Sequence, residues 1–478
     1  MYDKLIYEIS KPSRVAYSLP QSEINEYKIS DDLKRKISLD LPEVTELDVI
    51  RHYTKLSLKN YGVDQGFYPL GSCTMKYNPK IDEELSSLSG FINIHPLQPT
   101  DSVQGALKIY YETSKFLSEL TGMAEFSFCP FAGAHGELTG LMVMKEYFLQ
   151  NGDLKRTKVI VPNSAHGTNP ASSAVCGFEV VEIPSLETGT VDIEALKNVI
   201  DDTVAGIMLT NPNTVGIFEK DIIEIAKIMH DNGSLLYYDG ANLNAILGNA
   251  RPADMGFDIM HINLHKTFAT PHGGGGPGSG PVGVVEKLRH LLPNPRVVKN
   301  DEKYEFLVSD KSIGNVSGFY GNFLVVIKAY CYILSLGKEH IKDVSNLAVL
   351  NANYIKESLK DLYKLPIKNV CKHEVVFDGL INEKATTLEV AKRLLDYGYH
   401  PPTIYFPLLF HQALMIEPTE NESKETLDDF IEIMKKIAEE ADEDASILHD
   451  APHNTIVRRL DEVKAARTPI VKFKDLQK

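Results

Sequence analysis

Short apolar runs alternate with stretches of helical periodicity between residues 125 and 285, and this alternation most limits the possible fold. The predicted strands are residues 125–129, 158–161, 179–183, 204–209, 234–238, 258–264 and 281–285. The predicted helices between them are residues 136–149, 192–201 and 220–232. Such a pattern predicts an α/β fold with a large, mostly parallel sheet that helices cover on both faces. Ligands bind such sheets at the carboxyl ends of the strands, so the residues that follow each strand are the candidates for chemistry.

The remainder of the chain predicts two further regions. Residues 1–75 are expected to form an N-terminal arm, because prolines interrupt it, and residues 76–330 the large domain. Residues 331–478 are expected to form a linking helix, a smaller α+β domain and a charged tail. The elements predicted there are helices 322–360, 387–397 and 423–441 and strands 374–377 and 414–417. A length of 478 residues fits two or three domains.

Composition excludes several classes of function. The formal net charge is −15 and there is no long basic stretch, which argues against nucleic acid or an anionic membrane as a partner. No apolar run approaches the roughly 18 residues of a membrane span, and the amino end lacks a signal or transit pattern. The five cysteines have no CxxC spacing. They predict reduced thiols and a cytoplasmic protein.

A lysine lies between the strand predicted at 258–264 and a glycine-rich segment. Lys266 follows His265, and Pro277 and Pro281 interrupt the glycines behind it. Uncovered backbone amides in such a segment can approach an anion closely. Two GxGxxG matches occur here, but they open no helix, and no Gly-Lys-Ser/Thr ends the run, so neither a dinucleotide site nor a Walker A loop is predicted. A lone lysine is usually a solvated surface charge, but this position suits an amine that must reach a bound cofactor.

Polar residues follow four of the other predicted strands. A small-residue turn at 131–137 leads into a helix whose free amides would suit a phosphate, although an ordinary strand-to-helix turn would look the same. His166, Thr210 and Asp239 follow the strands predicted at 158–161, 204–209 and 234–238. Pyridoxal phosphate requires a lysine, a phosphate site, a carboxylate for its ring nitrogen and a flat side chain to stack on the ring. The positive ring nitrogen should lower the pKa of Asp239 by about 1–3 units.

Five motifs carry a resemblance to a known family. They are Gly-Ser-Cys-Thr-Met-Lys-Tyr-Asn-Pro (71–79), Ala-His-Gly-Thr-Asn-Pro (165–170), Leu-Thr-Asn-Pro-Asn-Thr (209–214), Tyr-Asp-Gly-Ala-Asn-Leu-Asn-Ala (238–245) and Asn-Leu-His-Lys-Thr-Phe (263–268) with the glycine-rich run behind it. They closely resemble the pyridoxal-phosphate-dependent glycine decarboxylase, the P-protein of the glycine cleavage system. The resemblance extends from the arm to Arg458–Lys464 and so covers nearly the whole chain.

The resemblance implies a fold, an activity and partners. The family fold is fold-type I, as in aspartate aminotransferase. The implied reaction is decarboxylation of glycine with transfer of the aminomethyl group to the lipoyl arm of H-protein. The length matches the lysine-bearing subunit of the split form of the enzyme, which pairs with subunit 1 in an α2β2 heterotetramer. The alternatives are another fold-type I enzyme, such as an aminotransferase or a desulfurase, and a non-catalytic scaffold, against which Lys266 argues.

The resemblance also implies roles for individual residues. Lys266 would form the Schiff base, Asp239 would pair with the ring nitrogen, and His166 would stack on the ring. The expected phosphate contacts are Ala134, His135 and His265, and the ring hydroxyl would be reached by Thr210 or Asn211. The group that holds the glycine carboxylate is not assigned. His261 and His265 have the i,i+4 spacing of helical zinc ligands, but on a strand they only share a face, so no metal site is predicted.

Overall fold

The computed structural model describes residues 4–16, 20–25, 27–37, 39–271 and 278–477, which form two compact units. One unit comprises Gly66–Asp450, and the other comprises Met1–Gln65 together with Ala451–Lys478. The chain therefore returns, after the first unit is complete, to join the residues with which it began.

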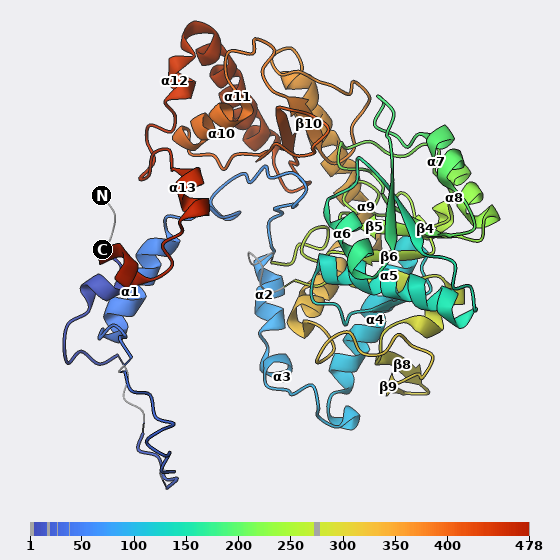
Figure 1. The fold of residues 1–478 in the computed structure, drawn as a ribbon, viewed down its shortest axis with the longest axis horizontal. Helices are drawn as coiled ribbons and strands as arrows, with labels where there is room; N and C mark the ends of the chain where they lie inside the picture. The colour runs from blue at the N-terminus through green and yellow to red at the C-terminus, as the bar shows by residue number, and fades with distance from the viewer. Residues whose placement is uncertain (1–3, 17–19, 26, 38, 272–277, 478) are drawn as a thin grey trace. The chain divides into compact units, whose positions relative to one another are not determined.

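The unit Gly66–Asp450 is built on a seven-stranded sheet (Figure 1). Its strands are β1 (Glu125–Ser127), β2 (Lys158–Pro162), β3 (Glu179–Ile183), β4 (Val204–Thr210), β5 (Leu235–Gly240), β6 (Ile259–Ile262) and β7 (Val282–Val284), in the order β1-β7-β6-β5-β4-β2-β3. The pairs β2–β3, β2–β4, β4–β5 and β5–β6 are parallel. This confirms the predicted α/β fold with a mostly parallel sheet, because all seven predicted strands are present.

Strand β7 is the exception to the parallel arrangement. It lies between β1 and β6 and runs antiparallel to both, with Val284 opposite Glu125 on one side and Ile259 on the other. Of the glycine-rich segment that precedes it, residues 272–277 lie outside the described residues, and residues 278–281 form no regular element. The sequence predicted the strand but not its direction.

Helices cover both faces of the large sheet. They are α4 (Gln104–Thr121), α5 (Gly133–Gln150), α6 (Thr168–Val175), α7 (Ile193–Val199) and α8 (Ile222–Asp231). One buried apolar cluster includes Leu117 of α4 and Ile225 of α8, and another includes Leu141 of α5. Burial of apolar side chains on both faces is what makes the central strands continuous apolar runs in the sequence.

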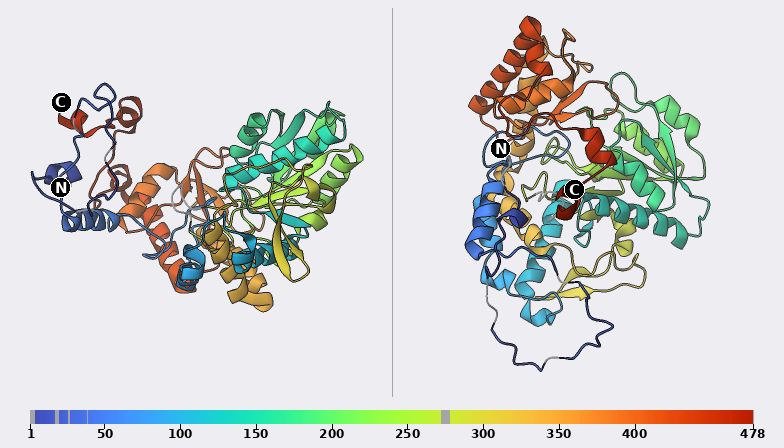
Figure 2. Two further views of the ribbon diagram at one scale, coloured as in Figure 1. Left: turned by 90° about the horizontal axis from the view of Figure 1, so that it is seen from below. Right: turned by 60° about the vertical axis from the view of Figure 1, so that its left-hand side comes forward.

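A long helix joins this domain to a smaller one. Helix α9 (Phe323–Leu359) has a non-helical residue, Gly337, within it, and it contributes to the large core at one end and to the small core at the other. The small domain contains β10 (Val375–Asp378), β11 (Thr403–Ile404), β12 (Ala413–Ile416), α10 (Thr387–Asp396), α11 (Lys424–Asp444) and α12 (Ser446–His449). Its strands form an antiparallel sheet in the order β10-β12-β11. Helices α10 and α11 lie beside this small sheet and away from the large one (Figures 1 and 2).

Shorter elements complete this unit. They are α2 (Lys80–Ser86), α3 (Ser89–Ile92), η2 (Thr100–Ser102), η3 (Pro252–Met255), η4 (Glu286–Leu291) and the hairpin β8 (Arg296–Asn300) and β9 (Lys303–Leu307). The hairpin was not predicted. Its strands mix exposed and partly buried positions, and only Arg296 is buried, so it lacks the buried apolar run that marks the central strands.

The second unit contains little buried apolar surface. It comprises η1 (Ile6–Ile9), α1 (Glu46–Ser57), α13 (Glu462–Arg467) and η5 (Phe473–Gln477). No residue of α1 is buried, and the rings of Tyr7 and Phe473 stack with centroids 4.8 Å apart. Across the described residues of both units, no helix combines the length and the apolar sequence needed to cross a membrane.

Candidate active site

A cavity of about 260 Å³ lies at the carboxyl ends of the central strands. It is lined by Ser72, Cys73, Gly133, Ala134, Glu137, His166, Thr168, Thr210, Pro212, Asn213, Thr214, Asp239, Ala241, Asn242, Asn263, His265, Lys266, His373 and Glu374. These residues come from the ends of β2, β4, β5 and β6, from the start of α5 and from the small domain. The topology therefore brings the predicted strand-end residues to one place, as expected for a parallel sheet.

A larger cavity of about 470 Å³ lies elsewhere, between α3, α4 and the start of α9. Its lining is mainly apolar and includes Phe91 and Phe319, and the titratable groups of the described lining are His95, Tyr110 and Tyr320. It contains none of the predicted site residues. We therefore place the chemistry in the smaller cavity, where the charged groups converge.

Lys266 contacts the irregular 71–79 segment. It lies in a turn just after β6, and its Nζ donates a hydrogen bond to the carbonyl oxygen of Ser72 at 2.5 Å. Ser72 and Thr74 both have positive φ, at 68° and 42°, a region that residues with a side chain rarely adopt. Such strained backbone persists where surrounding contacts impose it, and it concentrates at functional sites. The segment therefore forms one wall of the site.

The amino end of helix α5 opens onto the cavity. The helix begins at Gly133, its N-cap residue Ala132 makes no side-chain hydrogen bond, and no acidic residue lies in the first turn. Its first amides are thus left for a ligand, and the positive end of the helix dipole favours an anion. Ala134 lines the cavity, whereas the Nδ1 of His135 accepts a hydrogen bond from the backbone of Phe131 at 3.2 Å. His135 therefore faces the turn before the helix.

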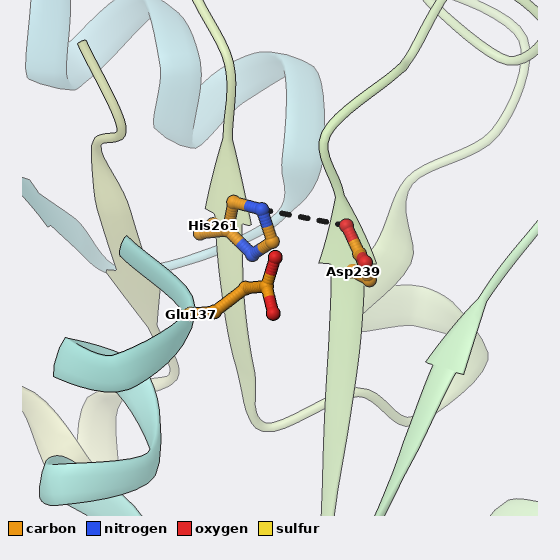
Figure 3. Close-up of side chains that lie close together, drawn as sticks. All are labelled: Glu137, Asp239 and His261. Carbon is orange, nitrogen blue, oxygen red and sulfur yellow. Dashed lines mark ion pairs between the residues drawn. The ribbon is translucent and has the colours of Figure 1, made fainter. Parts of the chain in front are cut away.

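Asp239 lies at the end of β5 in a buried cluster with His261 and Glu137 (Figure 3). Burial alone would raise the pKa of Asp239. That pKa is nevertheless held below its ordinary value by His261, by a hydrogen bond of 2.9 Å from the Asn169 amide, by the backbone N–H of Ala241 and by Lys266. Asp239 is therefore an ionised carboxylate at neutral pH.

Glu137 is the second carboxylate of this cluster and was not predicted. It accepts hydrogen bonds from Thr168 Oγ1 (2.8 Å), Asn169 Nδ2 (3.2 Å) and Ser172 Oγ (3.2 Å). Burial and the negative charge of Asp239 raise its pKa from 4.5 to about 7. Two adjacent buried carboxylates cannot both ionise without a nearby cation, so the pair carries a proton that a positive ligand could displace.

His166 faces the cavity from the loop between β2 and α6. Its Nδ1 lies 2.9 Å from Thr168 Oγ1, and the ring of Phe406 packs against it edge to face with centroids 5.4 Å apart. Burial lowers the pKa of His166, so its ring is neutral at neutral pH. Because Thr168 also donates to Glu137, the ring is connected to the carboxylate cluster.

The two candidates for the ring hydroxyl point in different directions. Thr210 lines the cavity, and its Oγ1 is buried without a hydrogen-bond partner. The side-chain oxygen of Asn211 instead accepts a hydrogen bond of 2.9 Å from the backbone of Glu219. His265 lines the cavity beside Lys266, and His261 groups with Glu137 and Asp239 rather than with His265.

Sequence reasoning missed an acidic wall supplied by the small domain. Glu374 directly precedes β10, Glu417 directly follows β12, and both are buried beside His373. The signal that identified Asp239, an acid at the end of an apolar strand, was also present at these two positions. The sequence alone does not show that the small domain packs against the strand ends of the large sheet.

The cavity fits the cofactor that the sequence implied. Its described lining includes the buried oxygens Thr210 Oγ1 and Asn263 Oδ1, both without a hydrogen-bond partner. Buried polar atoms are seldom left unpaired in native proteins, so such atoms point to a polar ligand. An amine, an ionised carboxylate and an uncapped helix end around one cavity match the aldehyde, ring nitrogen and phosphate of pyridoxal phosphate.

The chain has the fold of the fold-type I enzymes. Solved structures with this fold include the glycine decarboxylase (P-protein) of the glycine cleavage system, at a TM-score of 0.71 and 20% identity over 84% of this chain and 92% of that one. The glutamate decarboxylase of Lactobacillus brevis has a TM-score of 0.66 at 13% identity, covering 92% of this chain and 98% of that one.

Two family models match the sequence. One is described as glycine cleavage system P-protein and matches residues 19–304, and the other as glycine dehydrogenase, C-terminal domain, and matches residues 344–459. The chain belongs to the glycine cleavage system P-protein family. It is 60% identical to the probable glycine dehydrogenase (decarboxylating) subunit 2 of Caldanaerobacter subterraneus, over 99% of both chains. It is 55% identical to the protein of that name in Thermotoga maritima, over 98% of this chain and 99% of that one.

Proposed function

We propose that this chain is the lysine-bearing subunit of a pyridoxal-phosphate-dependent glycine decarboxylase, which releases carbon dioxide from glycine and passes the aminomethyl group to the lipoyl arm of H-protein. The observation that carries the proposal is the convergence of Lys266, Asp239 and the uncapped start of α5 on one cavity. The names of the relatives, which match along the whole chain, support the choice of glycine over other amino acids.

Five features of the chain would hold the cofactor. Lys266 would carry its aldehyde carbon, and Asp239 would pair with its ring nitrogen. The amides at the start of α5, around Ala134 and His135, would bind the phosphate together with His265. His166 would stack on the ring. Of the two residues proposed for the ring hydroxyl, Thr210 is favoured over Asn211 by its unpaired Oγ1 in the cavity.

When bound, the cofactor supplies a positively charged ring that delocalises the electron pair left on the α-carbon. Asp239 keeps that ring charged, because its low pKa holds a negative charge beside the ring nitrogen. The charge of the ring in turn lets Glu137 give up its proton. His166 contacts Thr168 and Phe406, which hold its side chain in place, and it would stack on the cofactor ring and fix its plane. Lys266 must release the Ser72 carbonyl before its amine can react.

The proposal includes a partner subunit and a carrier protein. The relatives are named as subunit 2, which supports an assembly with a subunit 1, and we propose an α2β2 heterotetramer. The large number of exposed apolar residues in the unit that contains α1, such as Ile24, Tyr27 and Leu33, supports a surface that a partner covers. Five free cysteines support a reducing, cytoplasmic location. We assign no metal to the site.

The test is isotope exchange between labelled bicarbonate and glycine. The chain, co-expressed with subunit 1 and supplied with pyridoxal phosphate and lipoylated H-protein, should incorporate label into the glycine carboxylate. Exchange should require each of the four components. An assembly that converts glycine only by transamination, or that releases sulfur from cysteine, would contradict the proposed reaction and favour one of the other fold-type I activities.

A further inference from the structure

Two buried glutamates of the small domain lie side by side, and one of them, Glu374, lines the cavity. Strands β10 and β12 pair with Val375 opposite Ile416, so Glu374 and Glu417 are the next pair at the end of the ladder. Glu374 is 3% exposed and Glu417 is not exposed at all. Two carboxylates this close and this buried retain at least one proton between them, because their charges repel and neither is hydrated. Which of them carries the proton follows from their partners.

Hydrogen-bond donors surround Glu417 but not Glu374. Glu417 accepts from Thr74 Oγ1 (2.8 Å), Asn242 Nδ2 (2.8 Å) and Asn244 Nδ2 (3.4 Å), which stabilise its ionised form. Glu374 accepts a single hydrogen bond from the described residues, 3.1 Å long, from the backbone N–H of Ser72 to its Oε2. Its Oε1 lies 3.6 Å from His373 Nε2, and both residues line the cavity. The proton therefore resides on Glu374.

The cavity lacks a conventional anchor for the carboxylate of an amino acid. No arginine is among the described residues that line it, and its lysine is Lys266, which the cofactor occupies. Burial lowers the pKa of His166, and it lowers that of His373 to about 3, so both rings are neutral. An ionised Glu374 would repel a substrate carboxylate, whereas a protonated one can donate a hydrogen bond to it.

We propose that Glu374, as a neutral carboxylic acid, binds the α-carboxylate of the substrate through a hydrogen bond from Oε1, with the His373 ring as its neighbour in the same subsite. The Nδ1 of His373 is buried without a hydrogen-bond partner, which marks an unfilled polar position next to Glu374. A hydrogen bond between an acid and a carboxylate is charge-assisted and short. The inference rests on the proposed glycine decarboxylase function and names the residue that recognises the leaving group.

The position of Ser72 relates this subsite to the reacting amine. Its carbonyl accepts from Lys266 Nζ, and its N–H donates to Glu374, so one residue separates the two side chains. In glycine a single carbon separates the amine from the carboxylate. Lys266 and Glu374 therefore contact the same residue, Ser72, so the proposed carboxylate subsite adjoins the wall that the reacting amine contacts.

A neutral donor also suits the chemistry better than a cation. The carboxylate loses its charge as carbon dioxide departs, so an arginine would stabilise the starting state more than the transition state and slow the step. A hydrogen bond from a neutral acid orients the carboxylate without binding its charge as strongly.

His373, Glu374 and Glu417 could instead form a cation site, since their possible ligand atoms lie within 4.8 Å of one another. The donors around Glu417 argue against that reading. The hydroxyl and amide protons that point at its oxygens occupy the lone pairs a metal would need. Burial raises the pKa of both glutamates, and the positive charge of Lys266 only partly opposes that rise.

The test measures glycine binding as a function of pH, with cofactor and subunit 1 present and H-protein absent. Equilibrium dialysis of labelled glycine would compare the wild type with Glu374→Gln, Glu374→Ala and a control, Glu422→Gln, which alters a half-buried acid outside the cavity whose pKa is likewise raised by burial. The titratable groups facing Glu374 are His373, Glu417, Lys266 and Cys73. All four remain in every variant.

The wild type and Glu422→Gln should lose glycine affinity about tenfold per pH unit once Glu374 ionises. Glu374→Gln retains a donor that cannot ionise, so its affinity should stay near the low-pH wild-type value after the titration of free glycine is allowed for. Glu374→Ala should bind about 10- to 100-fold more weakly at low pH. Binding of methylamine, which has no carboxylate, should be the same in all four proteins.

Two results would overturn the inference. One is a Glu374→Gln variant that keeps the wild-type loss of affinity, because another group would then be titrating. The other is a Glu374→Ala variant that binds glycine as the wild type does. If the wild type holds cofactor on Lys266 and yet binds no glycine, the proposed substrate itself is wrong, which separates failure of the proposed function from failure of this subsite.

Discussion

His261 Nε2 lies 3.3 Å from Asp239 Oδ1, and the two residues are direct partners in the parallel register of β5 and β6 (Figure 3). Parallel neighbours project their side chains to the same face, so the sheet itself sets this contact. The other ring nitrogen, Nδ1, lies 2.9 Å from the hydroxyl of Tyr237. The carboxylate that is proposed to charge the cofactor is thus held by strand register rather than by a loop.

Asp239→Asn should fold and bind cofactor but lose most of its activity. The amide cannot hold the ring nitrogen in its protonated form, and a loss of two pKa units there corresponds to about 2.7 kcal/mol, or roughly 100-fold in rate. The measurement is bicarbonate exchange at saturating cofactor. Asp254→Asn, at an exposed position, is the matched control. Exchange at the wild-type rate in Asp239→Asn would remove Asp239 from the mechanism.

Borohydride should fix the cofactor to Lys266 and to no other lysine. The informative comparison is Lys76, which is also buried near the site but is held by Glu420 at 2.8 Å and by the Thr267 carbonyl. Peptide mapping of the reduced protein identifies the modified residue. Lys266→Ala should show no covalent cofactor, whereas Lys76→Met should still be labelled if it folds. Label on Lys76 would show that the wrong lysine was assigned.

Glu137→Gln should change how stability depends on pH. The folded-state pKa of Glu137 is raised to about 7 from 4.5 by burial and by Asp239, so the folded protein keeps a proton that the unfolded chain loses. The stability that protonated Glu137 contributes to the folded protein is fully present below pH 4.5 and is lost as the pH rises through about 7. A pKa raised from 4.5 to about 7 corresponds to at most about 3–4 kcal/mol of stability.

Thermal melting of the cofactor-free protein measures this effect. The melting temperature of Glu137→Gln relative to the wild type should rise with pH between 4.5 and about 7 and then level off. The exposed Glu187→Gln variant should follow the wild type throughout. A constant difference between Glu137→Gln and the wild type would show that Glu137 does not titrate in this range.

Gly71→Ala should displace the 71–79 segment. A Cβ at Gly71 would lie 2.2 Å from Met415 Cγ, so either the segment or Met415 must move. Overpacking of this kind costs about 1–3 kcal/mol. The same substitution at Gly90, which has nothing within 4 Å, is the control. Chemical denaturation measures the stability of both variants. Gly71→Ala should be less destabilising in a Met415→Ala background, because the two closest atoms, Met415 Cγ and Sδ, are then absent.

The chain alone should be inactive or nearly so. Helix α1 buries no residue, and many apolar side chains of its unit are exposed, so a second surface is needed to cover them. Gel filtration should show weak homodimers or aggregates for the isolated chain and a heterotetramer after co-expression with subunit 1. Full bicarbonate exchange by the isolated chain with H-protein would contradict the proposed division into two subunits.

The fold was predictable where side-chain burial left a regular pattern. The central strands are apolar throughout because helices cover both faces of the sheet, and they were located to within two residues at most ends. Helix α6 was missed because Asn169 and Pro170 read as a turn, although proline is tolerated in the first turn of a helix. The direction of β7 could not be predicted, since strand patterns carry no sign of orientation.

The site was predictable only in part. Asp239, His166 and Lys266 follow strands, and strand ends meet in a parallel sheet, so their convergence could be expected. Glu137 lies on an apolar helix, and its proximity to Asp239 depends on how α5 packs. Glu374 adjoins a predicted strand and was visible as an acid at a strand terminus, but its place in the cavity depends on how the small domain packs, and the sequence carries no local pattern for that packing.

The insertion of β7 between β1 and β6 has a consequence for how the protein matures. Helix α5, the proposed phosphate site, starts just after β1. Lys266, the proposed reactive amine, lies between β6 and β7. The two parts of the site therefore follow strands that pair with β7 but are distant in the sequence. Pairing of such distant strands carries a large loop-closure entropy and forms late in folding. We therefore expect the proposed cofactor pocket to be completed late in folding, after strands that are distant in the sequence have paired.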